Sequence, residues 1–177
     1  MAEPIQPERA YFKDDGRIPN SALPLLLYRQ AFASGTRDLV SAIKERFAKN
    51  NWTGSWRASV FRFHHYHSTT HEVLAVHGGA ATLQFGGQQG RKFAVKAGDV
   101  IVIPAGVGHK RVDSSEEFGV VGAYPDGRQW DLLRGLPGER PLADRNIAAV
   151  PLPETDPLHG PEGPLKLAWK SGEEGKV

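Results

Sequence analysis

A run of short apolar segments between residues 55 and 125 most constrains the fold, because a turn follows almost every one of them. Apolar stretches of this length bounded by turn residues predict strands, whereas helices need longer periodic patterns. We expect strands at 56–66, 72–77, 80–85, 92–96, 100–103, 109–112 and 118–124. Residues 86–90, Gly-Gly-Gln-Gln-Gly, predict a hairpin loop. Many short strands joined by close turns indicate an all-β sandwich or jelly roll.

The segment before these strands predicts a strand and then a helix. Residues 23–32 are strand-like, and residues 36–50 carry apolar side chains at helical spacing, which predicts an amphipathic helix. Ser34 or Thr36 is the expected N-cap. We therefore assign residues 1–54 to an N-terminal strand and helix packed on a β-barrel that spans residues 55–125.

The C-terminal segment, residues 126–177, is rich in proline and glycine. A short helix is expected at 129–134 and a late edge strand at 165–169, with little other regular structure. Side chains such as Ile147, Leu152 and Trp169 are too apolar for a fully solvated tail. We expect an ordered extension of the same domain, wrapped over the barrel or over a partner.

Histidines gather at two places along the β region. His65, His67 and His71 stand close together, and His109 follows the later strand that begins after Gly98-Asp99. Strand alternation puts His65 and His67 on the same side, while His64 has the opposite parity and is not expected to join them. One histidine on an apolar face is usually a core residue, but four that converge are suited to a divalent transition metal.

These two segments resemble the two sequence motifs of the cupin superfamily. Gly98, Pro104, Gly106 and His109 match the second motif, with Asp113 where the family has asparagine. In the first motif His65 and His67 match, and Gly78 matches the closing glycine. The resemblance implies a double-stranded β-helix, or jelly-roll barrel. The whole chain is similar to small single-domain bacterial cupins of the YjlB type, a group without a settled activity.

The third ligand of the first motif is open between two neighbours. Counting back from Gly78 places His71 at the position of the family's glutamate, and this register gives Leu74 and Val76 the usual apolar positions. We therefore expect a metal site of His65, His67, His71 and His109, similar to the four-histidine manganese cupins. Glu72 is the alternative ligand, or a carboxylate that orients a neighbouring ligand.

The resemblance and the ligand types give the expected cofactor and function. Manganese or iron is the expected ion, with nickel or zinc as further candidates. A metal-dependent oxidoreductase, dioxygenase-like and acting on a small organic substrate, is the favoured function. The alternatives are a small-molecule-binding cupin without turnover, and a lyase or isomerase that uses the ion as a Lewis acid. The sequence identifies no catalytic residue beside the ligands. Residues that we expect to line the pocket are Arg57, Phe61, Phe63, Phe85 and Tyr124.

Composition excludes several other classes of function. The chain of 177 residues has a net charge of +2 and no basic stripe interleaved with aromatics, which argues against nucleic-acid binding. It has no cysteine, hence no disulfide and no thiolate ligand. Without a signal-peptide pattern or an apolar run long enough for a bilayer, we expect a cytoplasmic protein that does not bind membranes.

Residues 72–77 are apolar on both faces, which predicts that the N-terminal segment or a second subunit covers one of them. We expect a homodimer.

Overall fold

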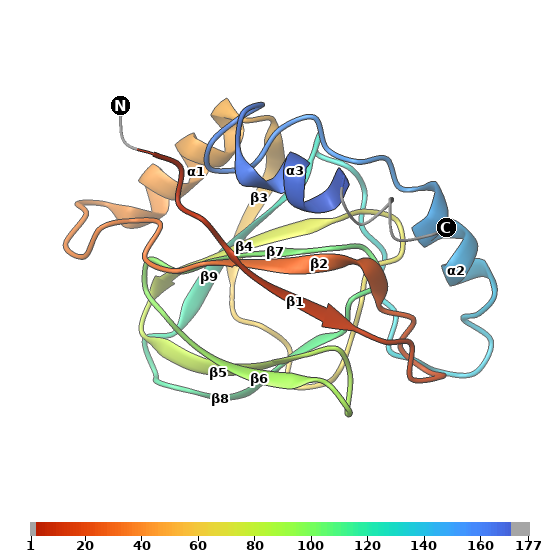
Figure 1. The fold of residues 1–177 in the computed structure, drawn as a ribbon. Helices are drawn as coiled ribbons and strands as arrows, with labels where there is room; N and C mark the ends of the chain where they lie inside the picture. The colour runs from red at the N-terminus through yellow and green to blue at the C-terminus, as the bar shows by residue number, and fades with distance from the viewer. Residues whose placement is uncertain (1–2, 171–177) are drawn as a thin grey trace.

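A computed structural model describes residues 3–170, which form nine strands and three helices (Figure 1). The strands are β1 (Glu8–Phe12), β2 (Ser21–Tyr28), β3 (Trp52–Ala58), β4 (Glu72–Gly78), β5 (Ala80–Phe85), β6 (Arg91–Lys96), β7 (Val100–Ile103), β8 (His109–Ser114) and β9 (Gly119–Pro125). The helices are α1 (Leu39–Lys49), α2 (Leu142–Ala149) and α3 (Pro164–Lys170). One sheet has the order β1-β2-β7-β4-β9-β3 and the other β6-β5-β8. All the paired strands are antiparallel, as expected for a jelly roll.

The main core lies between the two sheets. On β4, Leu74 and Val76 point into it, and so do Ile101 of the neighbouring β7 and Leu83 of β5 in the facing sheet. Because successive side chains of a strand alternate, the other residues of β4 must point to the opposite face of the six-stranded sheet.

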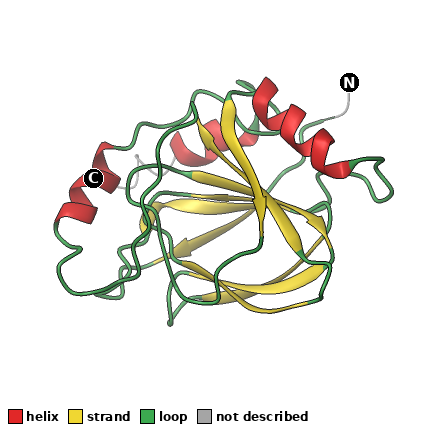
Figure 2. Ribbon diagram, turned by 180° about the vertical axis from the view of Figure 1, so that it is seen from behind, coloured by secondary structure: helices red, strands yellow, loops and turns green. Residues whose placement is uncertain are grey.

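That opposite face is covered by helices of the same chain. Figure 2 shows two of the helices above the strands and the third beside one end of them. A second core joins Val73 and Ala75 of β4 to Phe47 of α1 and Trp169 of α3. The extension after β9 thus packs on the sheet within residues 126–170, and residues 171–177 lie outside the described part. Since α1 and α3 cover β4, its two apolar faces no longer call for a second subunit, and the homodimer stays a prediction.

Several predicted elements differ in the structure. The strand expected at 56–66 is β3, which begins earlier at Trp52 and ends at Ala58, because β3 pairs with β9 and the chain then leaves the sheet. Asp38, rather than Ser34 or Thr36, caps α1 by accepting a hydrogen bond from the Ser41 N–H.

The extension contains two helices that the sequence did not predict correctly. Residues 164–170 form α3 instead of an edge strand, and α2 was not expected. No helix forms at 129–134, where Leu133 instead makes a β-bridge with Tyr66. Within residues 3–170, no helix is both long enough and apolar enough to span a bilayer.

Candidate metal centre

Backbone pairing brings the two histidine segments together. His65 and His109 form an isolated antiparallel bridge, in which each N–H donates to the other's carbonyl, at 3.2 and 2.9 Å. Directly opposed residues of such a pair have neighbouring side chains on one face. The centroids of the His65 and His109 rings are accordingly 4.0 Å apart.

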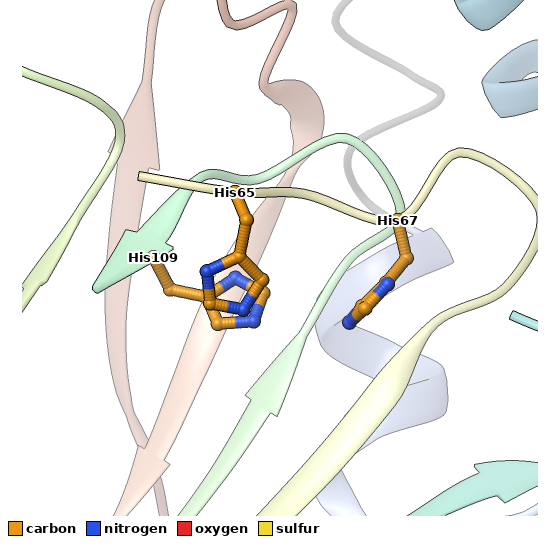
Figure 3. Close-up of side chains that lie close together, drawn as sticks. All are labelled: His65, His67 and His109. Carbon is orange, nitrogen blue, oxygen red and sulfur yellow. The ribbon is translucent and has the colours of Figure 1, made fainter. Parts of the chain in front are cut away.

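His67 completes a cluster of three imidazoles. One ring nitrogen of each of His65, His67 and His109 lies within 4.8 Å of the others, and all three side chains are buried. Figure 3 shows the rings on the same side of the segments that carry them. His64, as its parity predicted, is not part of the cluster.

Each of the three rings has its Nδ1 committed to a backbone carbonyl. His65 Nδ1 bonds to Phe63 O at 3.0 Å, His109 Nδ1 bonds to Val107 O at 3.1 Å, and His67 Nδ1 bonds to Asp131 O. A carbonyl oxygen only accepts, so each Nδ1 must carry the hydrogen. In the neutral ring the lone pair is then on Nε2, the tautomer that a metal ligand needs.

The fourth group at the cluster is the carboxylate of Glu72. Its oxygens lie 3.3 Å from His109 Nε2 and 3.5 Å from His67 Nε2, and the side chain is 3% exposed. Burial alone would raise the pKa of Glu72, but His67 and His109 lower it well below its ordinary range. Burial would likewise lower the pKa of His67, yet Glu72 raises it above the ordinary value. Burial, followed by the neighbouring His109, lowers the pKa of His65 to about 2.

His71 lies on the other side of the sheet, so the predicted four-histidine set is wrong. Its Nδ1 accepts the Ala105 N–H at 2.8 Å, and its ring packs 4.6 Å from that of Trp169 in the outer core. Burial lowers the pKa of His71 to about 3, consistent with a neutral core histidine. The cause is strand parity: Glu72 shares its face with Leu74 and Val76, which point into the barrel, whereas His71 shares the face of Val73.

The segment at 128–139, which we call the strap, fixes the loop that carries His67. Besides the bond from His67 to its carbonyl, Asp131 accepts hydrogen bonds from the N–H of Ser68 at 2.6 Å and from the Ser68 hydroxyl. Further along, Tyr66 donates from its hydroxyl to Glu139 at 3.0 Å. No local pattern indicates the strap, because its contacts are with residues more than 60 positions away along the chain.

A cavity of about 200 Å³ opens onto the cluster. Of the expected lining residues, Phe61 and Tyr124 are present. Arg57 is exposed elsewhere, Phe63 lies under the Arg134 guanidinium, and Phe85 belongs to the main core. Arg57 alternates with Trp56, which is the residue of β3 that lines the cavity. Phe63 lies in the segment where the chain has left the sheet after Ala58, and Phe85 of β5 packs in the core instead. The full lining is Trp56, Ala58, Ser59, Val60, Phe61, His65, His67, Glu72, Leu74, His109, Tyr124 and Trp130.

Tyr124 and Trp56 form a hydrogen-bonded wall of this cavity. The indole N–H of Trp56 donates to the Tyr124 hydroxyl at 2.7 Å. Burial, and then the hydrogen-bonded Glu72 carboxylate, raise the pKa of Tyr124 far above its ordinary value. Trp56 can lie across the sheet because residue 122 is glycine, where a Cβ would come within 2.3 Å of the indole ring.

The donor set fits a divalent transition metal. Three imidazoles with Nε2 lone pairs and one carboxylate are a nitrogen–oxygen set typical of such ions. Without a cation, a carboxylate would face two imidazole lone pairs in a buried site, unless a proton is taken up. The three-histidine cluster together with Glu72 is therefore the part of the described chain best suited to bind a metal ion.

Comparisons with known proteins agree with this fold. The Cupin domain family model matches residues 58–120. The chain is also 45% identical over 161 residues to "Uncharacterized protein YjlB" of Bacillus subtilis strain 168, covering 90% of this chain and 94% of that protein. The chain belongs to the cupin superfamily. Within that superfamily, the similarity to YjlB extends over nearly the full length of both chains.

Two solved structures show similarity at low sequence identity. A DUF861 family protein of Thermotoga maritima has 21% identity and a TM-score of 0.34, covering 46% of this chain and 86% of its own. Acireductone dioxygenase of Bacillus anthracis, with cadmium in its active center, has 14% identity and a TM-score of 0.40, covering 60% and 80%.

Proposed function

We propose that this protein is a metal-dependent oxidoreductase, dioxygenase-like, that converts a small organic molecule at a centre of His65, His67, Glu72 and His109. The observation that supports the proposal most is the convergence of these buried groups at a cavity that a small molecule can enter. A purely structural ion would be enclosed by its ligands, whereas this cluster lines an open pocket.

Manganese or iron suits the centre best. A ligand set of imidazoles and one carboxylate favours these ions more than a set of imidazoles alone would. Carboxylate oxygen is a preferred ligand of manganese, and iron binds both imidazole nitrogen and carboxylate oxygen. When bound, the ion would supply Lewis acidity and redox chemistry. The chain would contribute the aligned Nε2 atoms, the protonated Tyr124 hydroxyl beside Glu72, and apolar walls that exclude water.

A second candidate is a lyase or isomerase that uses the ion only as a Lewis acid. Such a reaction needs an acid or base at the substrate. In the described chain, Tyr124 is the one titratable side chain of the cavity lining outside the four proposed ligands. Its hydroxyl is engaged with both Trp56 and Glu72, which favours the oxidoreductase.

Metal analysis tests the proposal and the ligand set together. We expect near-stoichiometric manganese or iron in the purified protein, retained in His71→Ala and lost in Glu72→Ala. The iron(II) form should then bind nitric oxide, an analogue of dioxygen, with a new high-spin EPR signal that reports an open position. Absence of metal after reconstitution would refute the proposal. An iron(II) form that does not bind nitric oxide would refute the proposal that the centre reacts with dioxygen.

A further inference from the structure

We propose that the cavity receives a small, uncharged, planar molecule about the size of one substituted aromatic ring, and that its side chains do not recognise carboxylates. The inference rests on the proposed function, since it names the substrate class of the same site. It comes from the shape and charge of the cavity, which are properties of the chain itself.

The charge of the lining excludes recognition of an anion by the protein. In the described chain, no lysine or arginine lines the cavity, and Glu72 adds a buried carboxyl group to it. The nearby arginines are engaged elsewhere: Arg111 donates to Val60 O at 3.2 Å and to Ser114 Oγ at 2.7 Å, and Arg134 stacks on Phe63 at 3.9 Å. A carboxylate would lose its hydration without the guanidinium fork that usually replaces it.

The size of the cavity limits its occupant to a small molecule. Its volume of about 200 Å³ lies below the usual range for drug-sized ligands, about 300–1,000 Å³. An engineered apolar cavity of about 150 Å³ in another protein is sufficient to bind benzene. One ring with a few substituents therefore fills this space.

Aromatic side chains indicate that the occupant is planar. Phe61 and Trp130 both line the cavity and are each 49% exposed, although aromatic side chains of this size are mostly buried. Trp130 comes from the strap and lies 5.7 Å from the His67 ring, at 70°. A flat molecule packed against either side chain would bury exposed aromatic surface and gain ring-to-ring contacts.

The polar groups of the lining indicate where the occupant is oxygenated. The histidine cluster, Glu72 and Tyr124 lie together, whereas Val60, Phe61 and Leu74 supply apolar surface. A phenol-like molecule, with a hydroxyl at one end and an apolar ring at the other, matches this division.

Equilibrium dialysis with p-cresol and benzoate tests the inference. Both probes have one ring, and they differ in charge. We expect saturable p-cresol binding and, in the chelator-treated protein, benzoate binding at least about tenfold weaker, because the lining itself gives the carboxylate no cationic partner. The measurement is made on the protein as purified and repeated after chelator treatment, so it does not depend on the identity of the metal.

Three variants sharpen the test. Trp130→Ala should weaken p-cresol binding about 3- to 10-fold through loss of ring contacts, while Leu136→Ala, an exposed strap residue outside the cavity, should not change it. Ser59→Arg, which adds a cation to the lining, should raise the affinity for benzoate.

Three results would overturn the inference: a preference for benzoate in the chelator-treated protein, no binding of p-cresol, or equal p-cresol affinity in Trp130→Ala and wild type. Failure of the proposed function is distinguishable from failure of this inference, because it appears as missing metal in the elemental analysis, whatever the dialysis shows.

Discussion

Removing the Asp131 carboxylate should loosen the metal centre without touching a ligand. Asp131 accepts two hydrogen bonds from Ser68, the residue after His67, and its backbone carbonyl accepts from His67 Nδ1. Hydrogen bonds to a charged group contribute about 1.5–3 kcal/mol each. Because Asp131 is half-buried, water can replace part of these hydrogen bonds when the carboxylate is removed. We therefore expect Asp131→Ala to lose about 1–3 kcal/mol of the free energy that holds the His67 loop in place.

This loss should appear mainly as weaker metal binding. Disturbing the groups that orient a ligand typically costs about 10- to 100-fold in metal affinity, which is the size of the free energy estimated here. Manganese(II) affinity is measured from the EPR signal of the free ion, with Leu136→Ala as the control on the strap. Asp131→Asn keeps one hydrogen-bond acceptor, so its manganese(II) affinity should lie between those of Asp131→Ala and wild type. Wild-type affinity in Asp131→Ala, with native near-UV circular dichroism, would refute this role of the strap.

Three further predictions concern the rest of the molecule. Asp156 is fully buried and accepts from several N–H groups, so Asp156→Ala should lower the free energy of unfolding by about 3–5 kcal/mol, measured by urea titration against Asp156→Asn. Gly122→Ala should displace Trp56 and reduce p-cresol affinity, while metal content stays that of wild type. Burial would raise the pKa of Glu139, but hydrogen bonds from N–H groups and the Tyr66 hydroxyl lower it below its ordinary 4.5. The docking of the strap should therefore be complete above about pH 4.5 and weaken as pH falls through the lower folded value, an acid transition in tryptophan fluorescence that Glu139→Gln should remove.

Local patterning was sufficient to predict the β-barrel and three of the four proposed ligands. Strands such as β5 and β7 follow directly from short apolar runs between turns, and His65, His67 and His109 share a side because of strand and bridge geometry. The extension was less predictable, since α3 owes its burial to contacts of Trp169 with the distant Pro24 and His71. A periodicity over seven residues cannot anticipate such contacts.

The prediction of His71 as a ligand was wrong because strand alternation, which indicates Glu72, is a stronger constraint than motif spacing. Counting back from Gly78 selected His71, yet the same register placed Leu74 and Val76 in the barrel, and alternation then requires Glu72 to point inward with them. A residue of the opposite parity cannot reach the cluster without a bulge, and β4 is regular from Glu72 to Val76. The substitution of a carboxylate for the fourth imidazole also changes the chemistry expected of the site. With one anionic ligand, the net charge of a divalent centre falls to +1, which weakens its attraction for anions and agrees with a cavity that offers them no other cation.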